Sequence, residues 1–147
     1  MRDLRSKIDS VVAIGAAALA ADNTPAAIDL RGFDAAAVEI VVGVGGITFS
    51  ATNKVEFKLT ASDDNSTYTA VADADVDLTE SNITTVGTGG IVYSLIAAHA
   101  AATVVNIGYT GGKRYLKLLA DFSGTHGTAT PTAAQIIKAL PYDAPTA

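Results

Sequence analysis

The stretch KVEFKLT, residues 54–60, decides the fold class of this chain. Apolar and polar residues alternate along it, so Val55, Phe57 and Leu59 share one face of an extended backbone. Strict alternation fits a strand rather than a helix, because successive side chains of a helix point about 100° apart. The stretch therefore predicts a β-strand with one face in a core and the other in water.

Further strand-like runs lie on both sides of this stretch. They are residues 11–14, 28–30, 38–42, 90–96, 103–109, 113–119 and 135–140. Turns rich in Gly, Asp and Asn separate them. Short strands about ten residues apart predict an all-β fold, an antiparallel β-sandwich that is jelly-roll-like, with short or no helices. The best helix candidate is the Ala-rich segment 97–102.

The same pattern predicts the organisation of the chain. Residues 1–10 form a polar N-terminal arm, residues 11–142 the β-sandwich domain, and residues 143–147 a C-terminal tail. Polar arms of this kind become ordered when a partner holds them.

The apolar run 11–21 has two interpretations. It follows three basic residues and ends in small ones, which is the order found in secretory signals. Asp3 dilutes the basic region, Asp9 and Ser10 lie directly before the apolar run, and the run consists mostly of alanine. We therefore favour a first strand at residues 11–14 that leads into an Ala-rich connection.

Composition excludes several classes of protein. The chain has 147 residues, of which 49% are hydrophobic, so it can bury a core of its own. It has no Cys, which excludes disulfides and thiolate chemistry. Its formal charge of −5 argues against a nucleic-acid partner. No apolar run reaches the roughly 18–20 residues of a membrane span, so we expect no membrane partner.

Charge is distributed unevenly along the chain. No Lys or Arg lies between Lys58 and Lys113, and the acidic residues of that stretch carry a formal charge of −6. The rest of the chain then carries +1. Such asymmetry either orients a neighbouring copy or another partner by charge complementarity, or marks a solvated loop.

Three local patterns resemble chemical motifs but do not complete them. Asp73, Asp75 and Asp77 have the D-x-D-x-D spacing of a calcium loop, without its Gly and final Glu. The segment GYTGGKR, residues 108–114, lacks the Ser/Thr of a phosphate loop and precedes a strand. The only histidines, at positions 99 and 126, have no metal-ligand spacing. We therefore expect no enzyme activity, and no catalytic, cofactor-binding or metal-binding residues.

Two stretches together carry a resemblance to a known family. They are LTASDDNSTYTAV at residues 59–71 and GYTGGKRYLKL at residues 108–118, and residues 27–38 upstream fit the same pattern. In this order and spacing they resemble small structural proteins of tailed bacteriophages, encoded near the major capsid protein. The resemblance implies a capsid decoration or cement protein at the virion surface. Such a protein is a β-sandwich homotrimer that binds the major capsid protein and stabilises contacts between capsomers.

The matching stretches contain residues to which we assign structural roles. Ser62, Asp63 and Asp64 are expected to shape a turn through bonds from side chain to backbone. Tyr68 and Tyr115 are expected to bury their rings and keep their hydroxyls at a polar edge.

The second stretch supplies a turn and a strand. Gly111 lies in a Gly-Gly turn that permits positive φ. Lys113 and Arg114 begin the strand that follows. Upstream, Asp29 and Arg31 flank Leu30 and are expected to pair with a neighbour.

The basic residues of the arm are the candidate partner-binding residues. Arg2, Arg5 and Lys7 are expected to meet carboxylates on a neighbouring subunit. Each exposed pair contributes only about 0–1 kcal/mol, so binding would also need buried apolar area and many copies.

Two other functions remain open. A head–tail connector or tail component would form a ring rather than a trimer. A secreted carbohydrate-binding β-sandwich would present a row of exposed aromatic side chains, whereas this chain has no Trp and nine Phe and Tyr together.

Overall fold

The structure is a computed structural model that describes residues 3–142. Its elements, in chain order, are η1 (Arg5–Lys7), β1 (Ile8–Leu19), β2 (Ile28–Asp29), β3 (Phe33–Val42), β4 (Lys54–Ser62), β5 (Thr69–Ala70), η2 (Asp73–Asp75), β6 (Val76–Asp77), β7 (Ile91–Leu95), β8 (Thr103–Tyr109), β9 (Tyr115–Ser123) and β10 (Thr130–Pro141). Both helical elements are single 3₁₀ turns. No helix of the described part is long and apolar enough to cross a membrane.

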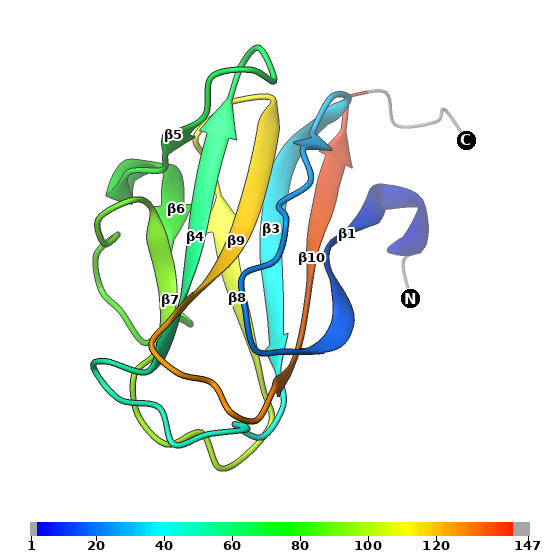
Figure 1. Cartoon of the computed structure of the whole chain (residues 1–147). Helices are drawn as coiled ribbons and strands as arrows, with labels where there is room; N and C mark the ends of the chain where they lie inside the picture. The colour runs from blue at the N-terminus through cyan, green and yellow to red at the C-terminus, as the bar shows by residue number, and fades with distance from the viewer. Residues whose placement is uncertain (1–2, 143–147) are drawn as a thin grey trace.

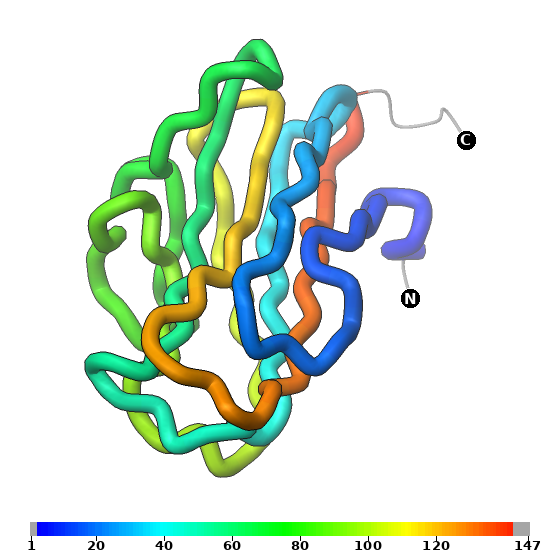
Figure 2. The backbone as a smooth tube through the Cα atoms, viewed as in Figure 1, coloured from blue at the N-terminus to red at the C-terminus, as the bar shows by residue number. Residues whose placement is uncertain are grey.

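The strands form two antiparallel sheets that pack face to face (Figure 1). Sheet A has the strand order β1-β10-β3-β8-β6, and sheet B has the order β2-β9-β4-β5, with β7 also paired to β4. The β-sandwich predicted from the sequence is confirmed. The chain passes repeatedly from one sheet to the other, as the tube in Figure 2 shows.

Strand alternation places the core between the sheets. In β4 the side chains of Val55, Phe57 and Leu59 are buried, as their period of two predicts. They meet inward-facing residues of β3 and β8, among them Ile40 and Ile107, which are fully buried. Burying side chains of this size contributes about 1.5–3 kcal/mol each and holds the two sheets together.

Side chains seal one edge of sheet B beside β9. The segment that follows β1, blue in Figure 2, runs alongside this strand. Asn23 donates from Nδ2 to the carbonyl of Leu118 and accepts the N–H of Ala120 at 2.7 Å. Asp22 accepts the N–H of Phe122 at 2.7 Å. These side chains satisfy backbone groups that a further strand would otherwise pair.

The edge beside β7 is sealed in the same way. The amide of Asn82 donates to the carbonyl of Ser94 and accepts its N–H. Ser81 donates from Oγ to the carbonyl of Val92 at 2.6 Å. Side chains thus pair with backbone groups at both edges of sheet B, beside β9 and beside β7.

Three expectations from the sequence differ from the structure. The Ala-rich run does not connect strands, because β1 extends from Ile8 to Leu19 and pairs with β10 along that length. The strand also begins inside the expected arm, so residues 8–10 belong to sheet A. Segment 97–102 forms no helix. It is too short to offset helix nucleation, and the carbonyl of His99 instead accepts the N–H of Gly45 at 2.8 Å.

Candidate functional site

The stretches that carry the resemblance meet at one end of the sandwich, which we call the loop end. It consists of the connections around residues 30–33, 62–69 and 109–115 together with residue 142. Ser62 pairs with Tyr115 across β4 and β9, so the first two matching stretches are neighbours in sheet B. Ile28 pairs with Leu116 and brings the upstream stretch beside them.

An ion pair ties two of these connections together. Arg114 donates from Nε and Nη2 to the two carboxylate oxygens of Asp29, at 2.9 and 2.7 Å. The hydrogen bonds from Arg114 lower the pKa of Asp29 to about 2 and raise that of the guanidinium. The neighbour with which Asp29 pairs is thus Arg114 of the same chain, the residue before the adjacent strand β9.

The turn after β4 forms largely as the sequence predicts. Asp64 accepts the N–H groups of Ser66 and Thr67 at 2.8 Å, and Ser62 donates its hydroxyl to the same oxygen. These hydrogen bonds, that of Thr67 foremost, lower the pKa of Asp64 to about 2. Among the described residues no hydrogen bond to the Asp63 side chain is found, so Ser62 and Asp64 shape the turn.

The two tyrosines and Lys113 lie at the same end. The hydroxyl of Tyr68 donates to Asn65. The ammonium of Lys117 lies over the ring of Tyr68, 4.1 Å from its centroid. Arg114 lies over the ring of Tyr115 at 4.8 Å. Both tyrosines are half-buried and have a cationic side chain over the ring. Lys113 donates from Nζ to the hydroxyl of Thr69 at 3.0 Å.

A hollow of about 330 Å³ opens between the two sheets at the loop end. Its lining includes three cationic side chains, those of Arg31, Lys113 and Arg114. Three aromatic side chains complete its walls, and they belong to Phe33, Tyr109 and Tyr142.

Tyr109 is the most buried of these aromatic residues, with 5% of its surface exposed. Its hydroxyl accepts the N–H of Lys113 at 3.1 Å. Burial raises the pKa of this hydroxyl, so it keeps its proton. A Cβ at Gly111 would lie 2.8 Å from the ring and hydroxyl of Tyr109, so this glycine is required for close approach, while the positive φ of the turn falls on Gly112.

The basic arm lies beside the exposed edge of sheet A. Arg5 and Lys7 form the 3₁₀ turn η1, which contacts β1 and β10, and both are exposed. No ion pair involves either residue within the described part of the chain. Arg2 lies outside the described residues, so its expected role has no structural counterpart here.

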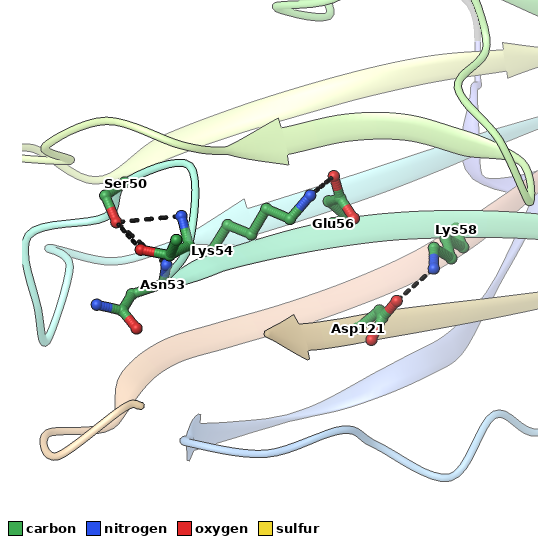
Figure 3. Close-up of polar contacts among 7 residues, drawn as sticks. Ser50, Asn53, Lys54, Glu56, Lys58 and Asp121 are labelled. Atoms are coloured by element: carbon green, nitrogen blue, oxygen red, sulfur yellow. Dashed lines mark hydrogen bonds and ion pairs between the residues drawn. The ribbon is translucent and has the colours of Figure 1, made fainter. Parts of the chain in front are cut away.

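The outer face of sheet B is polar, and charged side chains on it pair with one another. Lys54 pairs with Glu56 at 2.6 Å, and Lys58 pairs with Asp121 on the neighbouring strand (Figure 3). In the preceding turn Asn53 donates its N–H to the hydroxyl of Ser50 at 3.1 Å. This face is the solvated one that the alternation of β4 predicts.

The outer face of sheet A differs in character, and we call it the apolar face. Its outward residues on β1, β10, β3 and β8 include Ile8, Ser10, Val12, Ala133, Gln135, Ile137, Ala139, Ala35, Ala37, Glu39, Val41, Val104, Asn106 and Gly108. Val12 and Val104 are 66% and 55% exposed. Two carboxylates meet polar side chains of this face: Glu39 accepts a hydrogen bond from Gln135 at 2.8 Å, and Glu80 accepts one from Nδ2 of Asn106 at 3.2 Å. The sequence analysis missed this face, although the alternation in β3 and β10 contains its signal.

The acidic segment lies at the opposite edge of sheet A, around η2 and β6. Its carboxylates bind nearby backbone groups: Asp73 accepts the N–H of Val86, Asp75 that of Ala72, and Asp77 that of Thr79. In residues 3–142 no group of three or more His, Asp or Glu is placed to hold a metal ion.

The chain matches no family model, no curated protein and no solved structure in the comparisons with known proteins.

Proposed function

We propose that this chain is a non-enzymatic structural protein of a tailed bacteriophage virion. Its role would be that of a decoration protein that binds the outside of the capsid as a homotrimer. There it would contact the major capsid protein and stabilise the capsomers. The resemblance carried by residues 59–71 and 108–118 supports the family, and their meeting at the loop end is consistent with a shared structural unit.

The apolar face is the observation that best supports a role in assembly. Sheet B presents paired charges to water, whereas sheet A presents Val12, Val41 and Val104. Exposed apolar patches rimmed by polar residues are typical of surfaces that contact other proteins. A protein that works by packing against other subunits needs such a face.

Charge supports the same role. The exposed Arg5 and Lys7 lie beside one edge of sheet A, and the carboxylates of the acidic segment lie at the other. Opposite charges at opposite edges favour contacts in which one copy meets the next in a fixed orientation.

Light scattering of the purified chain tests the proposal first. We expect a mass near three times 14.9 kDa. A ring of six or more copies would contradict the decoration role and favour a connector or tail component. Co-sedimentation with capsids built from the major capsid protein of the same phage is the second test. A protein that stays in the supernatant would contradict the proposal.

A pair of matched variants tests the role of the apolar face. Val104→Glu places a charge on this face and is expected to reduce self-association or capsid binding at least tenfold. Leu119→Glu places the same charge on the outer face of sheet B, opposite Lys58, and is expected to leave both unchanged. Equal losses in the two variants would exclude the apolar face as the contact surface.

A further inference from the structure

We propose that the hollow at the loop end is a binding site for a carboxylate carried beside an apolar group. Its ligand would be a small aromatic carboxylic acid, or an acidic side chain next to an apolar one in a peptide. The proposal concerns a surface distinct from the apolar face and does not depend on where the protein assembles.

Arg31 supplies the available positive charge. Its backbone N–H donates to Asp29, but no hydrogen bond or ion pair of its guanidinium is found among the described residues. The neighbouring Arg114 uses two of its five N–H donors on Asp29 and is held over the ring of Tyr115. A fixed guanidinium beside a free one is a suitable arrangement for carboxylate oxygens.

Tyr109 supplies a neutral donor from the floor of the hollow. Its hydroxyl accepts the N–H of Lys113, and no acceptor for its own proton is found in the described part of the chain. A buried hydroxyl with an unused proton gains a partner when a ligand oxygen enters. Phe33 and Tyr142 form walls against which an apolar group can pack.

The surrounding charges favour a monoanion over a polyanion. Asp34 lines the hollow, and Asp75 and Asp63 lie close enough to Tyr109 to raise the pKa of its hydroxyl further. Asp29 also lies beside Arg114. These carboxylates would repel the multiple charges of a phosphate chain or nucleic acid, whereas a single carboxylate meets the free guanidinium.

Titration of the ¹⁵N-labelled full chain tests the site by NMR. The probes are phenylacetate, its uncharged analogue phenylacetamide, phenyl phosphate, and the peptides Ac-Phe-Glu-NH₂ and Ac-Phe-Gln-NH₂. We expect phenylacetate or the Glu peptide to shift the amide signals of Gly32, Gly112 and Lys113 in a saturable manner. Whichever of these two probes binds more tightly shows whether the site takes a small carboxylic acid or an acidic side chain of a peptide. Equal shifts with phenylacetamide, or tighter binding of phenyl phosphate, would overturn the proposal.

Three variants assign the contacts. Arg31→Gln should weaken binding about fivefold or more, and because its side chain is exposed the fold should persist. Tyr109→Phe should weaken binding with the amide spectrum otherwise retained. Lys54→Gln removes a cation from the outer face of sheet B and should leave binding unchanged. Unchanged binding by Arg31→Gln would exclude the site as described.

Discussion

Arg114 and Asp29, 85 positions apart in the sequence, form a bidentate ion pair that joins the end of β2 to the residue before β9. The N–H of Leu30 adds a backbone hydrogen bond to the carbonyl of Arg114 at 2.8 Å. The pair therefore holds one side of the hollow in place. It is also partly exposed, so its role is to orient side chains more than to stabilise the fold.

Acid should weaken the fold through Asp29 and Asp64. Both have a pKa of about 2 in the folded chain against an ordinary value of 3.8. A carboxylate with a lowered pKa stabilises the folded state above its ordinary pKa, and this contribution is lost as the pH falls. We expect the free energy of unfolding to fall between about pH 4 and pH 2. Urea denaturation followed by circular dichroism across that range measures it.

The variants Asp29→Asn and Asp64→Asn check the assignment. Each should make the dependence on pH in this window less steep, because the substituted group no longer takes up a proton. A double variant with the same slope as the original chain would contradict the assignment.

Removal of the Asn23 side chain should destabilise the protein by about 1–3 kcal/mol, because two backbone groups of β9 lose their partners. Urea denaturation gives the free energy, and the amide of Ala120 should exchange faster with deuterated water. Thr24→Ala is the control, since it changes an exposed neighbour in the same segment. A loss of the same size in Thr24→Ala would show that the segment, rather than the amide, is responsible.

Two adjacent glycines should respond differently to alanine. Gly89 and Gly90 have φ of +81° and +89°, so each substitution carries the left-handed penalty of about 1–2 kcal/mol. A Cβ at Gly90 would also lie 2.2 Å from the carbonyl oxygen of Leu59, whereas at Gly89 it meets only the flexible side chain of Lys58. Gly90→Ala should therefore lower the thermal unfolding midpoint much further than Gly89→Ala. Similar midpoints would contradict the close approach.

Replacing Lys138 with an apolar residue should cost less stability than removing its partner Asp9. Its side chain is nearly buried, pairs with Asp9 at 2.6 Å, and lies over the ring of Phe33 at 4.9 Å. Lys138→Met keeps the packing and removes the buried charge, so we expect a change within about 1 kcal/mol. Asp9→Ala leaves the charge without its partner and should cost more. Calorimetry of both variants decides the order.

The alternation of polar and apolar residues made much of the fold predictable. Residues 103–109 form β8 with the expected bounds, and the alternation in β4 correctly separates its core and solvent faces. The turn at Ser62 and Asp64 was predictable for a different local reason, because Ser and Asp side chains hydrogen-bond nearby groups of the chain.

Features that depend on distant neighbours could not be predicted in this way. The Ala-rich run becomes part of β1 only because β10 lies beside it. The alternation of β10 places Lys138 on the inward face beside Ile136, but its partners Asp9 and Phe33 come from other strands and cannot be read from that pattern. The hollow likewise depends on Arg31 and Tyr109, which tertiary structure brings together.

The sealed borders of sheet B bear on how this valine- and alanine-rich chain avoids forming fibres. Growth by strand addition needs two open borders on each molecule, one to receive a neighbour and one to offer to the next. Asn23 and Asn82 occupy both borders of sheet B. In sheet A, β6 covers only the last two residues of β8, so β1 and residues 103–107 of β8 are the borders without a strand neighbour among the described strands. Sheet B therefore offers little to strand addition at the borders that Asn23 and Asn82 occupy, and any edge-to-edge joining of molecules would have to use β1 or β8 of sheet A.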